Sequence, residues 1–216
     1  ATRSVISSYR GLGCKEGCAL RAEIGRDLGV PVTTDVHSPE EAEIAAEFID
    51  VLQIPAFLCR QTDLIVAAGR TGRAVNVKKG QFLAPWDVGN IADKLQAAGC
   101  RNFMFTERGT TFGYNNLVAD MRSLYWMREL GYRAVFDPTH SVQRPGGLGA
   151  TTGGDGKLAP VLARAAVAAG CDGVFMETHP EPHKALSDGP NQIPLNELGG
   201  VLRQLKQIHE IARTTV

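Results

Sequence analysis

Three features of this 216-residue chain predict an α/β fold built on a parallel sheet. Short β-branched runs alternate six times with longer segments of helical periodicity, without a linker or low-complexity segment. The runs are apolar almost throughout, as strands are when helices cover both faces of a sheet. Polar residues follow successive runs at their carboxyl ends, which favours a TIM (β/α)8 barrel over a doubly wound sheet with one switch point.

The elements follow from residue type and periodicity. In chain order, the predicted strands cover residues 30–36, 49–54, 74–78, 102–107, 133–137 and 173–177. The predicted helices cover residues 14–28, 40–47, 62–69, 86–98, 117–130, 158–169 and 197–212. Ser38-Pro39 supports the start of the second helix, because Ser caps a helix and Pro suits its first turn.

A complete barrel of this kind has eight strands in about 250 residues. Six predicted strands after a leading helix therefore indicate that the first two barrel strands are missing from this chain. We expect a single barrel domain over residues 1–216 that is incomplete at its N-terminus.

Composition limits the possible partners. Lys+Arg and Asp+Glu are each 23, and the formal net charge is zero, so neither nucleic acid nor membrane is expected. No apolar run approaches the length of a membrane span. The five cysteines are odd in number and widely spread, which indicates reduced thiols in a cytoplasm.

Two cationic residues lie at predicted strand ends. Lys78 closes an apolar strand, so we expect it to bind a phosphate or carboxylate or to act as a Schiff-base amine, unless it reaches out to solvent. Arg108 suits bidentate phosphate binding, unless it forms a structural pair with Glu107. Lys79 should point to the opposite face and be structural or solvent-exposed.

A second group combines one imidazole with two carboxylates. His140 and Glu177 are placed at strand ends, and Asp188 follows in a loop. This set suits a divalent metal with open positions, and it equally suits general acid/base chemistry. The glycine-rich loop over residues 141–156 is expected to be a mobile ligand loop.

Several long motifs resemble the 3-deoxy-D-manno-octulosonate 8-phosphate synthases. They are QIPAFLCRQTD at 53–63, NVKKGQF at 76–82, ERGTTFGYNN at 107–116, DPTHSVQ at 137–143 and ETHP at 177–180. The resemblance covers essentially the whole chain, in order.

The resemblance implies an enzyme that condenses phosphoenolpyruvate with arabinose 5-phosphate and water, in lipopolysaccharide precursor synthesis. The residues that would hold phosphoenolpyruvate are Gln53, Pro55, Ala56, Lys78, Arg108 and His140. Phe57 would separate the two substrates, and Asp35 would contact the sugar hydroxyls. Arg3 and Ser4 would hold the pentose phosphate, and Arg60 would reach a neighbouring subunit's site, which implies a homotetramer.

The resemblance also bears on catalysis and metal use. Lys78, His140 and Asp188 are the expected catalytic residues, and His140, Glu177 and Asp188 the expected metal ligands. A Cys in metal-dependent members, replaced by Asn in metal-independent ones, falls upstream of Ala1. The sequence at 145–149 and 185–188 resembles that of the metal-dependent group more closely, so a divalent ion such as Zn, Fe(II) or Mn is expected.

Two rival interpretations remain. The sister synthase that uses erythrose 4-phosphate shares the barrel, but it does not share the FLCRQTD and FGYNN text. The alternative from another class is a catalytically inactive fragment that binds ligands or pairs with other subunits. Thr2 is a departure from the family's usual Asn.

Overall fold

The computed structural model describes residues 6, 9, 11–146 and 153–213. Arg3 and Ser4, and the centre of the predicted loop over 141–156, lie outside the described residues. The chain forms two compact units, and each is taken by itself below. The first contains residues 10–80 and 86–105, and the second contains residues 81–85 and 106–216.

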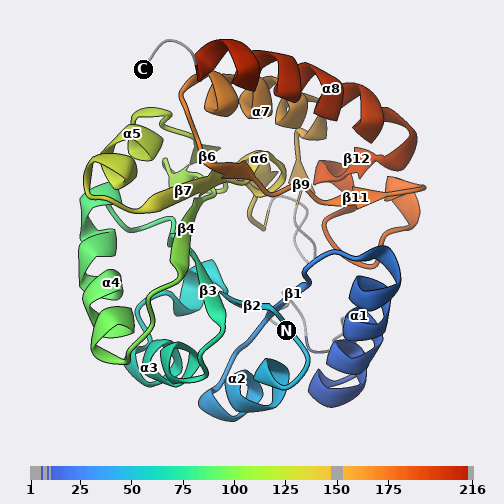
Figure 1. Ribbon diagram of the computed structural model, residues 1–216. Coiled ribbons are helices and arrows are strands. Elements are labelled where there is room, and N and C mark those ends of the chain that lie inside the picture. Colours follow the sequence, from blue (N-terminus) through green and yellow to red (C-terminus); the bar gives the residue numbers. More distant parts are fainter. Residues whose placement is uncertain (1–5, 7–8, 10, 147–152, 214–216) are drawn as a thin grey trace. The chain divides into compact units, whose positions relative to one another are not determined.

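The first unit alternates strands with helices. Its strands are β1 (Thr33–Asp35), β2 (Val51–Ile54), β3 (Ala74–Lys78) and the start of β4 (Phe103–Glu107). Its helices are α1 (Cys14–Leu28), α2 (Pro39–Ala46), the short η1 (Ala56–Leu58), α3 (Thr62–Arg70) and α4 (Val88–Ala97), the last preceded by η2 (Pro85–Asp87). The helix α3 packs beside both α2 and α4 (Figure 1).

Local sequence explains where these elements begin and end. Ser38 caps α2, its Oγ accepting the backbone N–H of Glu41 at 3.2 Å, and Pro39 opens the helix. Gly29 ends α1 in the left-handed region with φ 64°, a conformation that favours glycine. Strands β1, β2 and β3 are parallel, with Leu52 opposite Thr34 and Val75. Buried Leu52, Ile54, Val75 and Val77 then pack against the helices.

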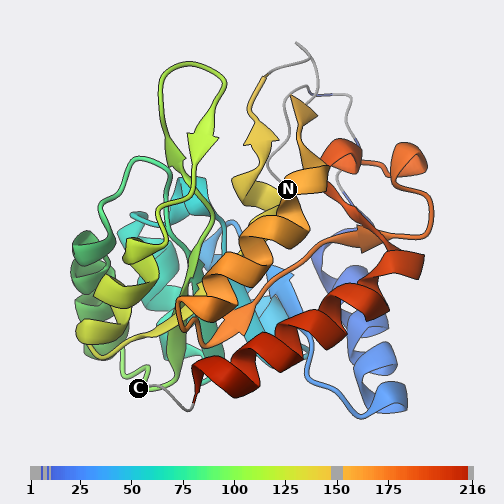
Figure 2. The same cartoon turned by 90° about the horizontal axis from the view of Figure 1, so that it is seen from above.

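The second unit also contains parallel strands, but much of it is loops and turns. Strand β7 (Arg133–Phe136) pairs in parallel with β10 (Gly173–Val174). The helices are α5 (Arg122–Glu129), α6 (Pro138–Ser141), α7 (Ala159–Ala168) and α8 (Leu195–Ala212), with the short η3 (Gly156–Leu158), η4 (Pro182–Lys184) and η5 (Gly189–Asn191). Helices α7 and α8 lie side by side (Figures 1 and 2), joined by a hydrogen bond from Arg164 to Gln204.

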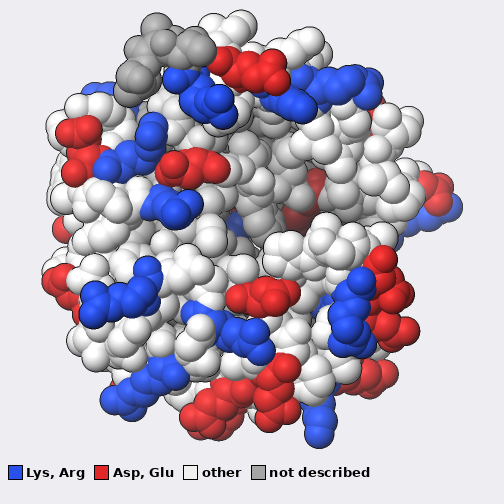
Figure 3. Space-filling view, viewed as in Figure 1, with Lys and Arg blue, Asp and Glu red and all other residues white. Residues whose placement is uncertain are grey.

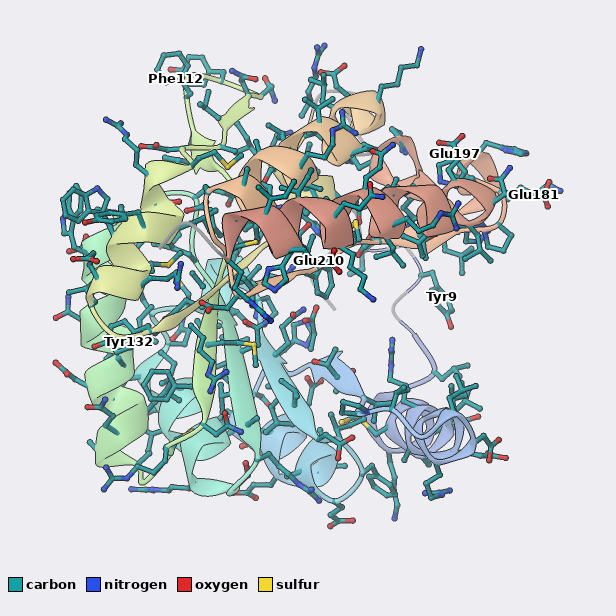
Figure 4. The ribbon with its side chains drawn as sticks, turned by 45° about the horizontal axis from the view of Figure 1, so that its top comes forward. Tyr9, Phe112, Tyr132, Glu181, Glu197 and Glu210 are labelled. Carbon is teal, nitrogen blue, oxygen red and sulfur yellow. The ribbon has the colours of Figure 1, made fainter. Side chains whose placement is uncertain are left out.

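Three two-stranded pairs complete the second unit. They are β5 (Thr110–Thr111) with β6 (Leu117–Val118), β8 (Gln143–Arg144) with β9 (Gly153–Gly154), and β11 (Thr178–His179) with β12 (Ile193–Pro194). Figure 2 shows the β5–β6 hairpin projecting beyond α5, and Figure 4 shows Phe112 at its tip, where 70% of the side chain is exposed. Val142, Ala159 and Ile193 form a buried apolar cluster in this unit.

The sheet has the strand order β1-β2-β3-β4-β7-β10, with β4 running from the first unit into the second. This confirms the α/β class and six strands in a parallel sheet. Closure into an eight-stranded barrel, the two missing strands and the single domain stay predictions. In the part of the chain that the structure describes, no helix is both long and apolar enough to cross a membrane. Basic and acidic side chains are interspersed over the face shown in Figure 3.

The ends of several predicted elements are wrong, and two of these differences bear on the second unit. The helix predicted over 117–130 begins only at Arg122, because Leu117–Val118 pairs with Thr110–Thr111 instead. The strand predicted over 173–177 ends at Val174, so Glu177 follows the strand rather than closing it. A short apolar run is compatible with either a helix or a strand. In the first case the local β5–β6 hairpin decides, and in the second the pairing with β7 covers only Gly173 and Val174.

Candidate functional site

In the first unit, three polar side chains form a ladder across the carboxyl ends of neighbouring strands. Asp35, Gln53 and Asn76 are partners in the strand register. Gln53 Nε2 donates to Asp35 Oδ1 at 2.6 Å, and Asn76 Nδ2 donates to Gln53 Oε1 at 2.9 Å. Gln53 and Asn76 are buried, whereas Asp35 is exposed and open to a ligand.

Two lysines follow each other at the end of β3. Lys78 is buried, with 5% of its surface exposed, so it does not reach out to solvent. Lys79 is fully buried, and its Nζ donates to the carbonyl of Gly80 at 3.3 Å. The prediction that Lys79 is structural fits this burial, and the alternative that it is solvent-exposed is wrong. A buried ammonium is costly to desolvate, so it is retained where anions or dipoles stabilise it.

The loop after β2 carries the remaining predicted residues of the first unit. Ala56–Leu58 forms the single turn η1, with Pro55 before it. Phe57 is 59% exposed and Arg60 is exposed, although each follows a buried strand. Both side chains are therefore available for contacts outside this unit.

In the second unit, Arg108 follows β4 directly and is buried, with 6% of its surface exposed. Its NH2 donates to Gln143 Oε1, while its NH1 has no hydrogen-bond partner among the described residues. Burial lowers the pKa of the Arg108 guanidinium, and the carboxylates of Asp137 and Asp188 act in the opposite direction. A buried cation with one unused donor is suited to bind an anion there.

The turn after Arg108 needs glycine. Gly109 has φ 91°, and a Cβ there would lie 3.3 Å from Leu117 Cβ. Its N–H donates to Glu107 Oε1 at 2.7 Å. This bond engages Glu107 with the backbone of its own turn.

His140 is held by Asp137, a residue for which the sequence suggested no role. His140 lies in the single turn α6, after β7, and not at the strand end as predicted. Asp137 is fully buried and caps this turn, accepting the His140 N–H at 2.9 Å. Its Oδ2 also lies 2.6 Å from His140 Nδ1, and its Oδ1 accepts the Thr139 hydroxyl at 2.8 Å.

The structure brings together the three predicted metal ligands. Ligand atoms of His140, Glu177 and Asp188 all lie within 4.8 Å of one another, and His140 Nε2 is 3.5 Å from Glu177 Oε1. Asp137 engages Nδ1, which leaves Nε2 for a ligand. One imidazole and two carboxylates therefore fit a divalent cation, and the same atoms can also move a proton.

Gln143 is the second residue that the sequence did not single out for a role. It is buried on β8, accepts from Arg108 NH2 and donates from Nε2 to Asp188 Oδ1 at 2.7 Å. Asp188 itself adopts a left-handed backbone with φ 53°. The DPTHSVQ sequence contains Asp137, His140 and Gln143, but only the folded structure shows that Asp137 pairs with His140 while Gln143 contacts Arg108 and Asp188.

Two of the other histidines make local hydrogen bonds. His37 bonds locally with Glu41 at 3.1 Å, and His179 Nδ1 accepts the backbone N–H of Glu181. Figure 4 shows Glu181 on the surface, where it also pairs with Lys184. Neither histidine belongs to the group around His140.

Fold and site define a class of protein: an α/β protein with a parallel sheet, a buried arginine with a donor that has no partner among the described residues, and a histidine with two carboxylates whose ligand atoms lie close enough to hold a metal ion. Residues 1–214 match the model of the DAHP synthetase I family, and the chain belongs to that family.

Its relatives include three proteins named 2-dehydro-3-deoxyphosphooctonate aldolase. The protein of Nitratidesulfovibrio vulgaris is 58% identical over 96% of this chain and 76% of its own length. Those of Geotalea uraniireducens and Geobacter metallireducens are 55% and 56% identical, each over 99% of this chain and 78% of the relative.

Proposed function

We propose that this chain condenses phosphoenolpyruvate with D-arabinose 5-phosphate and water. The products are 3-deoxy-D-manno-octulosonate 8-phosphate and inorganic phosphate, in the synthesis of lipopolysaccharide precursors. The observation that carries the proposal is the similarity to relatives named 2-dehydro-3-deoxyphosphooctonate aldolase, at 55–58% identity over nearly the whole chain. The buried Arg108, with its unused NH1, supports an anionic substrate.

The substrate-binding roles are proposed residue by residue, from the motif in which each stands. Phosphoenolpyruvate is bound by Gln53, Pro55, Ala56, Lys78, Arg108 and His140. Asp35 contacts the sugar hydroxyls, Phe57 separates the substrates, and Arg3, Ser4 and Arg60 bind the pentose phosphate. The cations offset the repulsion between two anionic substrates and hold them in a reactive geometry.

In the reaction, carbon 3 of the enol attacks the aldehyde of the sugar, and positive charge develops at carbon 2. Water adds at carbon 2, and phosphate leaves when the C–O bond breaks. Arg108 donates from NH1 to the substrate anion, in a buried environment where such a bond is strong. Where no metal ion is bound, His140, with Nδ1 held by Asp137, presents Nε2 to accept or donate a proton.

We also propose that His140, Glu177 and Asp188 hold a divalent ion such as Zn, Fe(II) or Mn. The observation that supports this is the short spacing of the three ligand atoms around a histidine whose other nitrogen is already engaged. When bound, such an ion would orient water or a sugar hydroxyl as a Lewis acid.

The test is turnover by the purified chain. Phosphoenolpyruvate with arabinose 5-phosphate should release inorganic phosphate, and each substrate alone should not. Chelation followed by addition of Mn(II) should abolish and restore the rate. Release without any dependence on chelators would contradict the metal proposal and leave the reaction intact.

A second candidate is condensation with erythrose 4-phosphate, which the name of the matching family model favours. The same assay with erythrose 4-phosphate separates the two reactions. Faster phosphate release with the four-carbon sugar would replace the first proposal. Binding of phosphoenolpyruvate without release from either sugar would favour a ligand-binding protein that does not catalyse turnover.

The proposal also covers the closed barrel, the oligomeric state and the location of the protein. The six-stranded parallel sheet is proposed to belong to a (β/α)8 barrel. The exposed Arg60 is proposed to reach a neighbouring copy in a homotetramer, which light scattering during size-exclusion chromatography would test. A cytoplasmic location is proposed from the reduced thiols and the biosynthetic substrates.

A further inference from the structure

A single amide joins the buried cation of the second unit to one of its acidic ligands. Arg108 NH2 donates to Gln143 Oε1, and Gln143 Nε2 donates to Asp188 Oδ1 at 2.7 Å. Arg108 and Gln143 are 6% and 8% exposed, so little water is available to replace either bond. Gln143 is thus in contact with both charged groups at once.

The chemistry of the two partners allows the amide one orientation. A guanidinium only donates hydrogen bonds and a carboxylate only accepts them, so the carbonyl must face Arg108 and the NH2 must face Asp188. The backbone of Gln143 is held as well, because it pairs with Gly154 between β8 and β9. A movement of one charged group is therefore transmitted to the other.

We propose that Gln143 couples the binding of an anion at Arg108 to the binding of a divalent metal at Asp188, so that each ligand raises the affinity for the other. This inference rests on the proposed function, because it takes phosphoenolpyruvate as the anion and His140, Glu177 and Asp188 as the metal ligands.

The sign of the coupling follows from preorganisation. An anion that bonds to NH1 fixes the guanidinium, and the guanidinium then fixes the amide of Gln143. The fixed amide holds Asp188 Oδ1 in place, so that less ordering remains for the metal to impose. Linkage requires that the metal raises the affinity for the anion by the same factor.

The experiment measures this factor directly. The whole chain is stripped of metal, and Mn(II) is titrated by calorimetry with and without saturating phosphoenolpyruvate. The coupling factor is the ratio of the two dissociation constants, and we expect about fivefold or more for the unaltered chain, within the usual range of coupling between sites. Gln143→Met keeps the length of the side chain and removes both hydrogen bonds, so the factor should fall below about twofold.

Gln192 provides a matched control. Its Nε2 donates to the carbonyl of Ser187 at 3.0 Å and lies 3.4 Å from Glu177 Oε2, so it touches the triad at a different ligand. Gln192→Met should weaken Mn(II) binding and keep the coupling factor of the unaltered chain. An equal loss in both variants would mean general loosening of the site, and it would overturn the proposal.

Two further outcomes decide the matter. A factor near one in the unaltered chain, or an unchanged factor in Gln143→Met, would overturn the role of Gln143. If circular dichroism shows that Gln143→Met does not fold, Gln143→Glu replaces it: the acceptor for Arg108 stays, the donor to Asp188 is lost, and the factor should again fall. Phosphate release is measured separately, so a chain that couples the ligands without turnover contradicts only the proposed reaction.

Discussion

The two units hold their polar side chains in different ways. In the first unit, Asp35, Gln53 and Asn76 lie on adjacent strands in one register, and each bonds to its strand neighbour. In the second, Arg108, Gln143 and Asp188 come from the end of a strand, a short hairpin and a loop. The strands of the sheet hold the ladder residues in place, whereas the residues on turns and loops are held by the hydrogen bonds among their own side chains.

The difference matters for function, because the second group contains a hydrogen-bond donor, Arg108 NH1, that has no partner among the described residues. The ladder uses its amide groups within the sheet. The first arrangement fixes geometry, and the second is prepared to bind. Substitution of the buried ladder residues should therefore lower stability in addition to any effect on substrate binding, whereas substitution of Arg108 should act mainly on binding.

The largest effect is expected from Arg108→Ala. Removal of the guanidinium removes the buried donor for the substrate anion, so kcat/KM for phosphoenolpyruvate should fall at least about a hundredfold. The free energy of unfolding, measured in urea, should fall by about 1–3 kcal/mol, so the chain should stay folded.

Arg164→Ala is the matched control for this prediction. Arg164 lies on α7 of the same unit and donates to Gln204. Its removal should leave kcat/KM for phosphoenolpyruvate unchanged. Unchanged kinetics in Arg108→Ala would overturn the assignment of Arg108 to the substrate.

The next effect concerns Asp137→Asn. Asn can still cap the turn α6, but its NH2 cannot accept the proton of His140 Nδ1. The imidazole should then carry its proton on Nε2, which blocks the nitrogen that faces Glu177. Affinity for Mn(II), measured by calorimetry, should fall about 10- to 100-fold.

Asp172→Asn tests whether any carboxylate that accepts a backbone N–H in this unit would do the same. Asp172 Oδ2 accepts the backbone N–H of Ala134 at 2.7 Å in the same unit, away from His140. Mn(II) affinity should stay unchanged in this variant. Equal affinity in Asp137→Asn and the unaltered chain would remove Asp137 from the metal proposal.

Sequence patterns predicted the first unit better than the second, for physical reasons. The strand Ala74–Lys78 and the helix Cys14–Leu28 have the predicted bounds, because period-two and period-3.6 patterns report directly on burial. The ladder positions Asp35 and Gln53 were also predicted as site residues. The loops offered no such period, so the hairpins β5–β6 and β8–β9 were missed.

The sequence predicted the three possible metal ligands of the second unit but not the residues that hold them in place. His140, Glu177 and Asp188 come together as expected, since their chemistry is visible in their residue types. Asp137 and Gln143 acquire roles only through the turn α6 and the positive φ of Asp188, which no periodicity reports. Contacts between residues about 45 positions apart, as from Gln143 to Asp188, depend on the whole fold.

A smaller effect is expected from Gln53→Leu in the ladder. The buried Nδ2 of Asn76 would lose its acceptor, while the exposed Asp35 can bond to water instead. The free energy of unfolding should fall by about 1–3 kcal/mol, measured by urea denaturation. In the double variant with Asn76→Leu, the free energy of unfolding should recover much of this loss, because both polar partners are then replaced. An additive loss would show that the ladder does not stabilise the sheet.

The smallest effect is expected from glycine-to-alanine substitutions in helices. They test whether the helices of the two units behave alike, in which case the difference between the units lies in their polar groups. Gly89 in α4 and Gly199 in α8 are both helical, and a Cβ at either would meet no atom closer than 3.6 Å. Replacement by Ala should raise the free energy of unfolding by about 0.5–1 kcal/mol in each case, since glycine is a poor helix former. Urea denaturation measures both, and a gain at Gly89 with a loss at Gly199 would show that the units also differ in their helices.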